Sequence, residues 1–503
     1  MKKFILSLSF LFIFSSLLSA QENADVEVLP EGLTIQSVEI LPKSIELTNN
    51  RDYRQVLILG HLESGQIADL TRMSNVEGNL QHVAVSSDGM ITPLSEGNEQ
   101  VTFRFGDATV QLEVKVTSIA TPPSNFVQDV QPVLSKMSCN AGTCHGAKDG
   151  KGGFKLSLRG YDELYDHRAF TDDIGARRFN RAAPDQSLML LKATGSIPHV
   201  GGVRTDVDSR YYKTIRAWIT GGAKLDQKVS RVTSIDVSPK NPIIPRAGMK
   251  QQMTVMATFS DGSVRDVSRE AFIESGNIEV IEADENGLLT VLRRGEGPVL
   301  IRYEGNYAAT TLTVMGDRSG FAWEEPEHYN YIDKHVYNKL QRVKVLPSDI
   351  CTDEEFVRRV YIDVTGLPPT ADNVREFLND MRPSREKRNA LIDTLIGSQQ
   401  YVEHWTNKWA DLLQVNRKFL GEQGAISLRN WIKHSIATNK AYNQFAHEVL
   451  TATGSTIENP PAAYYKVIRD PATLMENTTH LFLAVRFNCN KCHDHPFERL
   501  TQD

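Results

Sequence analysis

Cysteine is scarce in this sequence, with five residues in a chain of 503. A secreted scaffold held together by disulfides carries a much higher density of cysteine, so that class is excluded. After residue 20 no apolar run reaches the roughly 18 residues that a membrane-spanning helix needs, and we expect no membrane span. The net charge of -6 is small and spread along the chain, which argues against a nucleic-acid-binding surface.

The N-terminus is the most apolar part of the chain. Residues 1–20 read MKKFILSLSFLFIFSSLLSA, with two lysines before the apolar run and Ala20 where a signal peptidase could cut. This pattern predicts a secretory signal peptide, and a buried core helix is the alternative reading. No cysteine follows the run, so a lipid anchor is not expected. The mature protein is therefore predicted to be periplasmic, at the cell surface or secreted.

A chain of this length is expected to form three or four domains. Comparison of the sequence with itself finds two copies of one unit of about 85 residues, at 33–117 and 230–316. Short alternating runs within each copy are separated by turn pairs such as Asp261-Gly262 and Asn286-Gly287, which predicts an antiparallel sandwich. The matching stretches are 37–42 with 234–239, 65–71 with 262–268, 88–92 with 286–290, and 101–105 with 299–303.

Both copies resemble the bacterial Ig-like group 2 domain, through the central "sDGs..DvT" turn and the later "G.lt" strand. The first copy departs from this pattern at Glu63-Ser64-Gly65, where the acidic residue of the turn is displaced. The resemblance implies an all-β sandwich that acts as a spacer, with adhesion or carbohydrate contact as the alternative role.

Two other regions show helical patterns. Residues 122–226 open with apolar residues at helical spacing in 126–137 and close with a helix at 210–219, before Gly221-Gly222. In residues 328–503, Thr352 and Glu355 form a predicted capping box. The expected fold is therefore multi-domain: two all-β Ig-like sandwiches, one small all-α domain and one C-terminal, mainly α-helical domain.

The last of these regions contains the sequence Cys489-Asn490-Lys491-Cys492-His493. On a helix, positions i, i+3 and i+4 share a face, so both thiols can meet the vinyl groups of one porphyrin while the imidazole reaches the iron. A thioredoxin-like redox pair lacks its βαβ context here. A zinc site that adds His495 would be geometrically cramped but stays open, as does a structural disulfide.

The small helical region has a related motif, with Cys139, Cys144 and His145. Its cysteines are five residues apart, so an ideal helix would not place them on one face, and we expect the chain to bulge at Gly142. A disulfide between the two cysteines is a competing reading. The histidine directly after the second cysteine favours haem.

Residues 122–226 resemble the planctomycete cytochrome C domain, through CNAGTCHG at 139–146 and GGFKLSLRGYD at 152–162. Residues 328–503 resemble the helical domain of unknown function that accompanies such cytochromes, through FVRRVYIDVTGLP and CNKCHDHPF. The resemblance implies that Cys139 and Cys144 anchor one haem c and that His145 is its proximal ligand. It implies the same roles for Cys489, Cys492 and His493 in a second haem c.

The distal ligand of the first haem is expected at His199. Related cytochromes carry a methionine there in an "MPP.G" context, whereas this chain reads Ile197-Pro198-His199-Val200-Gly201-Gly202. Two histidine ligands would lower the reduction potential relative to a Met/His pair. The alternatives are that His199 is a plain loop histidine or that Met189 is the ligand. For the second site no distal ligand is evident, and His480 is expected on a buried helix.

We therefore expect an extracytoplasmic c-type haem protein that transfers electrons to a redox partner protein. One alternative is a haem-dependent oxidoreductase acting on an exported or saccharide-derived substrate, with extracellular carbohydrate as a partner. Another is a surface adhesion protein with structural disulfides. No residue is assigned a catalytic role. Because the chain stops a few residues after His493, we expect the natural sequence to continue.

Overall fold

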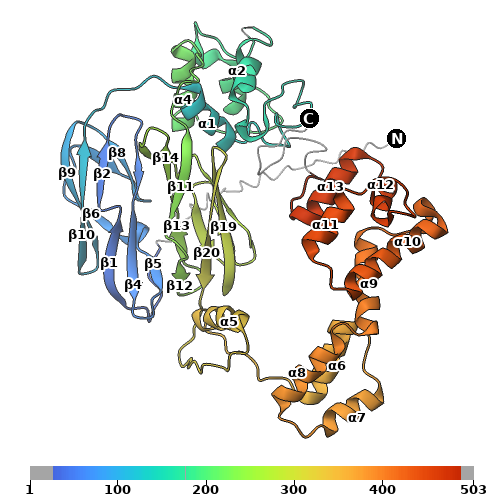
Figure 1. Cartoon of the computed structure of the whole chain (residues 1–503). Helices are drawn as coiled ribbons and strands as arrows, with labels where there is room; N and C mark the ends of the chain where they lie inside the picture. Colours follow the sequence, from blue (N-terminus) through green and yellow to red (C-terminus); the bar gives the residue numbers. More distant parts are fainter. Residues whose placement is uncertain (1–26, 176, 489–503) are drawn as a thin grey trace, which may run out of the picture. The chain divides into compact units, whose positions relative to one another are not determined.

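The computed structural model describes residues 27–175 and 177–488, and Figure 1 shows it coloured along the sequence. Strands make up residues 35–116 and 232–314, and helices make up the region between them and residues 331–483. The chain divides into two compact units, which are described separately. The first comprises residues 1–122, 233–301 and 307–317, and the second comprises residues 123–232, 302–306 and 318–503.

The first repeat copy consists of three small sheets whose side chains alternate between core and solvent. Along one strand, Leu112, Val114 and Val116 are buried and the residues between them are exposed, because successive side chains of a strand point to opposite faces. The sheets are β1(Ile35–Leu41)-β4(Leu57–Leu62)-β5(Ile67–Asp69), β2(Ser44–Leu47)-β10(Ala108–Val116)-β9(Gly97–Phe105)-β6(Asn75–Glu77) and β3(Arg54–Gln55)-β8(Met90–Pro93)-β7(Val83–Val85).

The second copy repeats this strand order sheet by sheet. Its sheets are β11(Val232–Ser238)-β14(Thr254–Phe259)-β15(Val264–Asp266), β12(Ile243–Ile244)-β20(Asn306–Val314)-β19(Gly295–Tyr303)-β16(Phe272–Ser275) and β13(Lys250–Gln252)-β18(Leu288–Val291)-β17(Ile281–Ala283). The prediction of purely antiparallel pairing was wrong for one pair in each copy, since β2 runs parallel to β10 and β12 runs parallel to β20. β1 and β2 belong to different sheets, so the two residues between them, Pro42 and Lys43, do not form a hairpin.

The two copies contact each other through a reciprocal pair of hydrogen bonds. The backbone N–H of Gln55 donates to Asp266 Oδ2 at 2.7 Å, and the backbone N–H of Gln252 donates to Asp69 Oδ2 at 2.7 Å. Both carboxylates are buried, and each also accepts the N–H two residues further along its own chain. These bonds satisfy N–H groups at the edges of β3 and β13 that would otherwise be left open.

The arginines next to these bonds, Arg72 and Arg269, have different partners in the two copies. Arg72 forms an ion pair with Asp69 of its own copy, at 3.2 Å. Arg269 instead reaches into the first copy, where it donates to Gln55 Oε1 at 2.9 Å and pairs with Asp88. Burial raises the pKa of Asp266.

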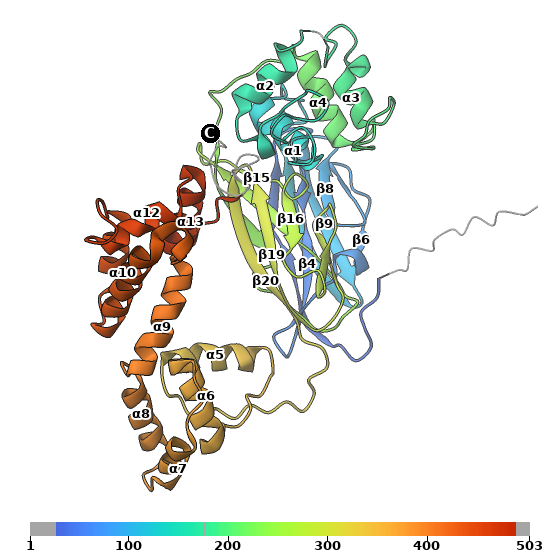
Figure 2. The same cartoon turned by 90° about the vertical axis from the view of Figure 1, so that its right-hand side faces the viewer.

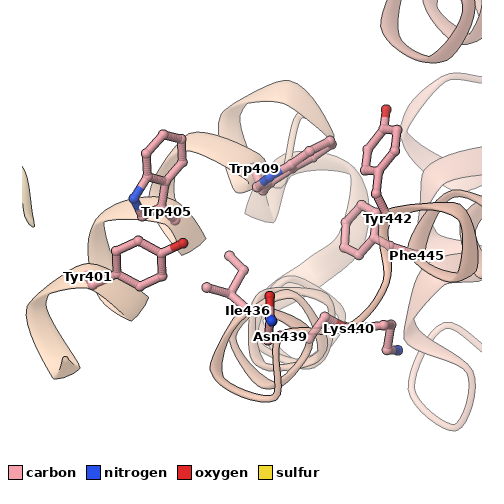
Figure 3. Close-up of a pocket in the computed structure, with 9 residues that line it drawn as sticks. Tyr401, Trp405, Trp409, Ile436, Asn439, Lys440, Tyr442 and Phe445 are labelled. Carbon is pink, nitrogen blue, oxygen red and sulfur yellow. The ribbon is translucent and has the colours of Figure 1, made fainter. Parts of the chain in front are cut away.

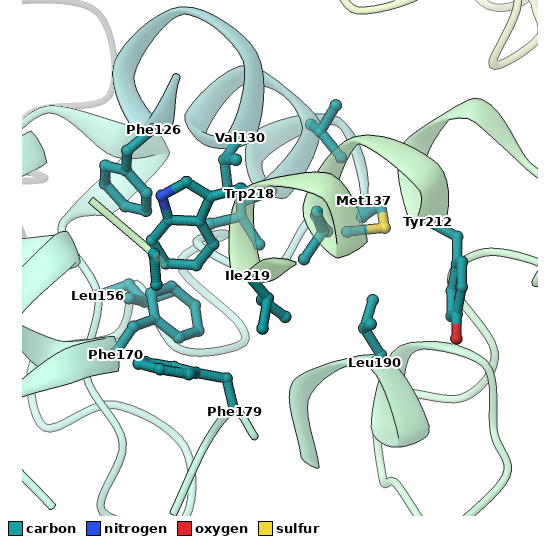
Figure 4. Packing of buried hydrophobic residues seen from close by; sticks show 14 of the residues in the cluster. Phe126, Val130, Met137, Leu156, Phe170, Phe179, Leu190, Tyr212, Trp218 and Ile219 are labelled. Carbon is teal, nitrogen blue, oxygen red and sulfur yellow. The ribbon is translucent and has the colours of Figure 1, made fainter. Parts of the chain in front are cut away.

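Residues 123–232 form a small helical region around a single apolar core. Trp218 lies against Phe126, with ring centroids 5.1 Å apart, and both side chains are fully buried (Figure 4). Met189 packs against this core from its edge, as expected for an apolar residue rather than a ligand. The elements are the π-helix Phe126–Val130, α1(Gln131–Lys136), α2(Glu163–Thr171), α3(Leu188–Ala193), α4(Arg210–Thr220) and the 3-10 turns Leu158–Gly160 and Pro184–Gln186.

Residues 331–483 are helical, and α9 contacts both α6 and α10 (Figure 2). The predicted capping box is present, since Thr352 caps α6 and the Glu355 side chain accepts the N–H of Thr352. The prediction of a buried helix around His480 was wrong, because α13 has no buried residue and His480 is exposed. The helices are α5(Tyr331–Arg342), α6(Asp353–Thr365), α7(Ala371–Asn379), α8(Ser384–Leu395), α9(Gln399–Leu412), α10(Arg417–Ala437), α11(Tyr442–Leu450), α12(Ala463–Val467) and α13(Pro471–Leu483), with a 3-10 turn at Pro460–Ala462.

Among the described residues, no helix is both long enough and apolar enough to cross a membrane.

Candidate functional site

The loop after α1 carries the first predicted cysteine motif. It leaves the helix at Ser138, whose φ of 62° is left-handed, and it is closed by backbone hydrogen bonds. Cys139 N–H donates to Leu134 O at 2.9 Å, and His145 N–H donates to Cys139 O at 3.1 Å. The second bond holds the histidine backbone against the first cysteine. The loop is thus a fixed turn that brings the ends of the motif together.

The predicted role of Gly142 was wrong, because its backbone lies outside the left-handed region. The glycine that the loop requires is Gly146, where an added Cβ would lie 2.2 Å from Asn140 O. Asn140 is itself buried and donates to Ser135 Oγ at 2.8 Å. Gly146 therefore packs closely against the backbone of the buried Asn140. The spacing of the cysteines did not indicate that a glycine is needed at position 146.

Both cysteines of the loop are free thiols, so the disulfide reading is not realised in this structure. Cys139 packs against the apolar core. Burial raises its pKa to about 12, while the nearby Arg204 opposes this shift and Cys144 adds to it. The Cys139 thiol therefore stays protonated at neutral pH, with Cys144 close by.

The imidazole of His145 is held in one orientation. Its Nδ1 lies 2.8 Å from Phe154 O and its ring packs on the Phe154 ring, with centroids 4.7 Å apart. Burial lowers the pKa of His145, which favours the neutral ring. A neutral imidazole that donates from Nδ1 to a carbonyl keeps a lone pair on Nε2, as a metal-bound histidine must.

His199 is arranged in the same way. Its Nδ1 lies 3.2 Å from Gly202 O, which again leaves Nε2 for another partner. His199 is close enough to His145 for its charge to lower the His145 pKa further. The charge of His199 therefore acts on His145 although the two lie far apart in sequence, and each has Nδ1 anchored to a backbone carbonyl.

Arg178 adds a positive charge beside Phe154, the residue whose carbonyl holds His145. Its guanidinium carbon lies 4.2 Å from the centre of the Phe154 ring. The side chain is 9% exposed, and within the described residues its Nη1 has no hydrogen-bond partner. Burial lowers its pKa, and the charge of Asp173 opposes this shift. A buried N–H without an acceptor is costly, so an anionic group from outside the chain would be stabilised here.

These features fit a c-type haem. Cys139 and Cys144 could form the two thioether bonds, His145 and His199 could hold the iron, and Arg178 could pair with a propionate carboxylate. In residues 27–175 and 177–488 no group of three or more His, Cys, Asp or Glu side chains is placed to hold a bare metal ion. Iron in a porphyrin needs only two ligands from the protein.

The second predicted motif, Cys489, Cys492 and His493, lies outside the described residues. The structure therefore leaves its haem, zinc and disulfide readings as predictions.

A hollow in the C-terminal helices was missed by the sequence analysis. Trp405 and Trp409 are four residues apart, which is the spacing of a core stripe on a helix, and Trp409 does pack against the core of this region. Trp405 and Trp409 also line a hollow together with Tyr401. The signal available in the sequence was the recurrence of aromatic residues at positions 401, 405 and 409, which marks one helix face without saying what covers it.

Residues 331–503 match the model of the family PSCyt2, described as a protein of unknown function (DUF1549). The matched segment is about a third of the chain and contains the Cys489–His493 motif. It agrees with the expected accompanying helical domain. No curated protein matches the chain.

Solved structures similar to the chain include surface layer protein SbsC, domains 4–9, with 10% identity and a TM-score of 0.24, covering 57% of this chain and 32% of that chain. Domains 5–6 of the S-layer protein SbsC have 9% identity and a TM-score of 0.24, covering 57% and 100%. Drosophila OTK, extracellular domains 3–5, has 8% identity and a TM-score of 0.12, covering 56% and 63%. The chain thus spans about a third of the first of these, and similarities this low carry no functional argument.

Proposed function

We propose that this protein is an extracytoplasmic c-type haem protein that transfers electrons to a redox partner protein. The observation that carries the proposal is the imidazole of His145, directly after Cys144, whose Nδ1 lies 2.8 Å from Phe154 O, together with His199, whose Nδ1 lies 3.2 Å from Gly202 O. In this proposal Cys139 and Cys144 form the thioether bonds, and residues 122–226 are a cytochrome c-like domain. The Ig-like copies act as spacers, and a second haem c is attached at residues 489–493.

A bound haem supplies a one-electron redox couple, and the chain sets the conditions in which it works. The Phe154 carbonyl accepts from His145 and makes the imidazole a stronger electron donor, which favours a low reduction potential. The core around Trp218 and Phe170 keeps water from one side of the site. Arg178 could form an ion pair with a propionate carboxylate of the haem. Export by the predicted signal peptide would place this site outside the cytoplasm.

The test is to produce the chain in a host competent in cytochrome c maturation and to measure covalently attached haem by pyridine haemochrome spectra and intact mass. The double variant Cys139→Ala, Cys144→Ala is expected to lose one haem per chain, because no thioether can form there. Cys351→Ala is the matched control, since Cys351 is also a free, half-buried thiol but has no histidine beside it. The control keeps the full haem content.

Replacement of the distal ligand gives a second, independent measurement. His199→Ala keeps the covalent haem but changes the spectrum from that of an iron with two histidine ligands. A colourless full-length protein, with the motif sulfurs oxidised to each other or bound to zinc, would contradict the proposal.

A further inference from the structure

The helices α9, α10 and α11 enclose a hollow of about 140 Å3 that belongs to no site described so far. Figure 3 shows the side chains of α9 on one side of it and the end of α10 on the other. The residues that line it are Tyr401, Trp405, Trp409, Ser435, Ile436, Asn439, Lys440, Tyr442 and Phe445.

The aromatic wall of the hollow is held in place from behind. The Trp409 ring packs on Phe445 with centroids 4.8 Å apart, and Phe445 stacks on Trp431 at 4.7 Å. Trp405, one helical turn earlier on α9, lies 6.1 Å from the ring of Tyr401. Two indole faces are therefore presented without any rearrangement of the helices.

Polar groups also border the hollow. Figure 3 shows the Tyr401 hydroxyl and the Asn439 side-chain oxygen pointing into the space between the two tryptophans. A hydroxyl both donates and accepts hydrogen bonds and an amide oxygen accepts them, so a ligand group that does both suits this space. Trp405 Nε1, which makes no hydrogen bond within the described part of the chain, lies on the far side of its ring from this space.

The lining carries no available charge. Its one ionic side chain is Lys440, whose Nζ lies 2.5 Å from Glu448 Oε2 and 4.9 Å from the centre of the Trp431 ring. Glu448 also accepts hydrogen bonds from Trp431 Nε1 and Gln444. Because Lys440 is paired, the residues that line the hollow offer no free charge to a phosphate or a carboxylate. Lys408 is not part of the lining, and its Nζ lies 5.0 Å from the centre of the Trp405 ring.

We propose that this hollow binds a neutral saccharide unit. A pyranose ring has an apolar C–H face that packs on an indole, and hydroxyl groups around its edge that donate and accept hydrogen bonds. A cavity of roughly 150 Å3 holds one benzene molecule, so the hollow suits a single six-membered ring. With so few atoms in contact, the dissociation constant of a monosaccharide is about millimolar. The proposal does not depend on haem at either cysteine motif.

The experiment uses the full chain and measures binding of methyl glucoside, methyl galactoside and methyl xyloside by saturation-transfer NMR and calorimetry. At least one of these neutral glycosides is expected to bind. Glucuronate, which adds a charge, and cyclohexanol, which lacks the ring of hydroxyls, are expected to bind less well. Absence of binding by all three glycosides, or equal or tighter binding of glucuronate or cyclohexanol, overturns the proposal.

Variants locate the binding. Trp405→Ala removes one stacking face, and Asn439→Gly removes the amide at a residue whose φ of 50° glycine adopts freely. Each is expected to weaken glycoside binding about fivefold or more, the loss of one good contact. Trp323→Phe is the control, because Trp323 lies outside the hollow. Unchanged binding in both hollow variants, or equal loss in the control, overturns the assignment, and haem content is unaffected in every variant.

Discussion

The cysteine–histidine site and the aromatic hollow recognise their partners by different means. The first gathers ionisable and reactive side chains, with a buried Arg178 whose Nη1 makes no hydrogen bond within the described residues. The second presents indole faces and neutral polar groups, and its lysine is already paired with Glu448. Covalent chemistry depends on particular residues at fixed spacing, whereas recognition by shape depends on packing. The first kind of site is therefore visible in a sequence, and the second becomes visible only in a structure.

The largest expected difference between the two regions is in how the stability of each depends on pH. Asp166 lies beneath the first site, and burial raises its pKa to about 7, although Ser157 and Gln131 donate hydrogen bonds to it. Gln131 Oε1 has no partner within the described residues, and a flipped amide would accept a hydrogen bond from a neutral Asp166. The pKa of Glu448 near the hollow is lowered, first by Lys440.

The sign of each effect follows from linkage. Asp166 stabilises the folded state fully below the pKa of the unfolded chain, which is about 4. This contribution to the free energy of unfolding, at most about 4 kcal/mol, is lost as the pH rises through 7. The Glu448 contribution is present above its unfolded pKa and is lost as the pH falls. Urea unfolding at pH 5 and pH 8 is expected to show a pH dependence that Asp166→Asn removes. If Asp166→Asn destabilises equally at both pH values, Asp166 is ionised throughout.

The two tryptophans of the hollow should differ in their structural cost. Trp409→Ala is expected to lower the free energy of unfolding by about 3 kcal/mol, because its ring packs on Phe445 in the core. Trp405→Ala is expected to cost about 1 kcal/mol, since that ring borders the hollow instead. Denaturant titration followed by circular dichroism measures both. Equal costs would mean that Trp405 is a core residue after all.

Two glycines of the first motif provide a matched pair. Gly146→Ala places a methyl group against a backbone carbonyl and is expected to cost about 2 kcal/mol and to reduce haem attachment. Gly142→Ala is expected to be tolerated, because its new Cβ would meet only Leu158 Cδ1 at 3.5 Å. Haem content per chain and the unfolding midpoint decide the outcome. A larger loss of stability for Gly142→Ala than for Gly146→Ala would support the expectation from the sequence that the chain bulges at Gly142.

Arg178→Gln should give the smallest effect, with opposite signs with and without haem. Before haem is attached, the variant is expected to be more stable, because a buried charge with an unsatisfied N–H has been removed. With haem attached, loss of one positive charge is expected to lower the midpoint potential by roughly 50 mV. This corresponds to an electrostatic interaction of about 1 kcal/mol. Potentiometric titration of both proteins tests this. An unchanged potential would place the guanidinium away from the redox centre.

The sequence predicted the parts of the molecule that depend on neighbouring residues. The repeat, the capping box at Thr352 and most helices of the C-terminal region follow from local patterns, and His145 follows directly after Cys144. It could not predict the Phe154 carbonyl or Arg178, because folding across the small helical region brings them to the histidine. The parallel pairing of β2 with β10 also escaped, since that pairing joins strands about 70 residues apart.

The crossed bonds of Asp69 and Asp266 set a limit on how the repeat can assemble. Each copy offers the same patch, one carboxylate and one backbone amide, and each patch is consumed by its equivalent in the other copy. A contact of this self-complementary kind closes on itself after two members, whereas head-to-tail contacts can continue without end. Through this surface the repeat therefore forms a closed pair. Neither copy has an N–H of this patch left to donate to the carboxylate of a third module.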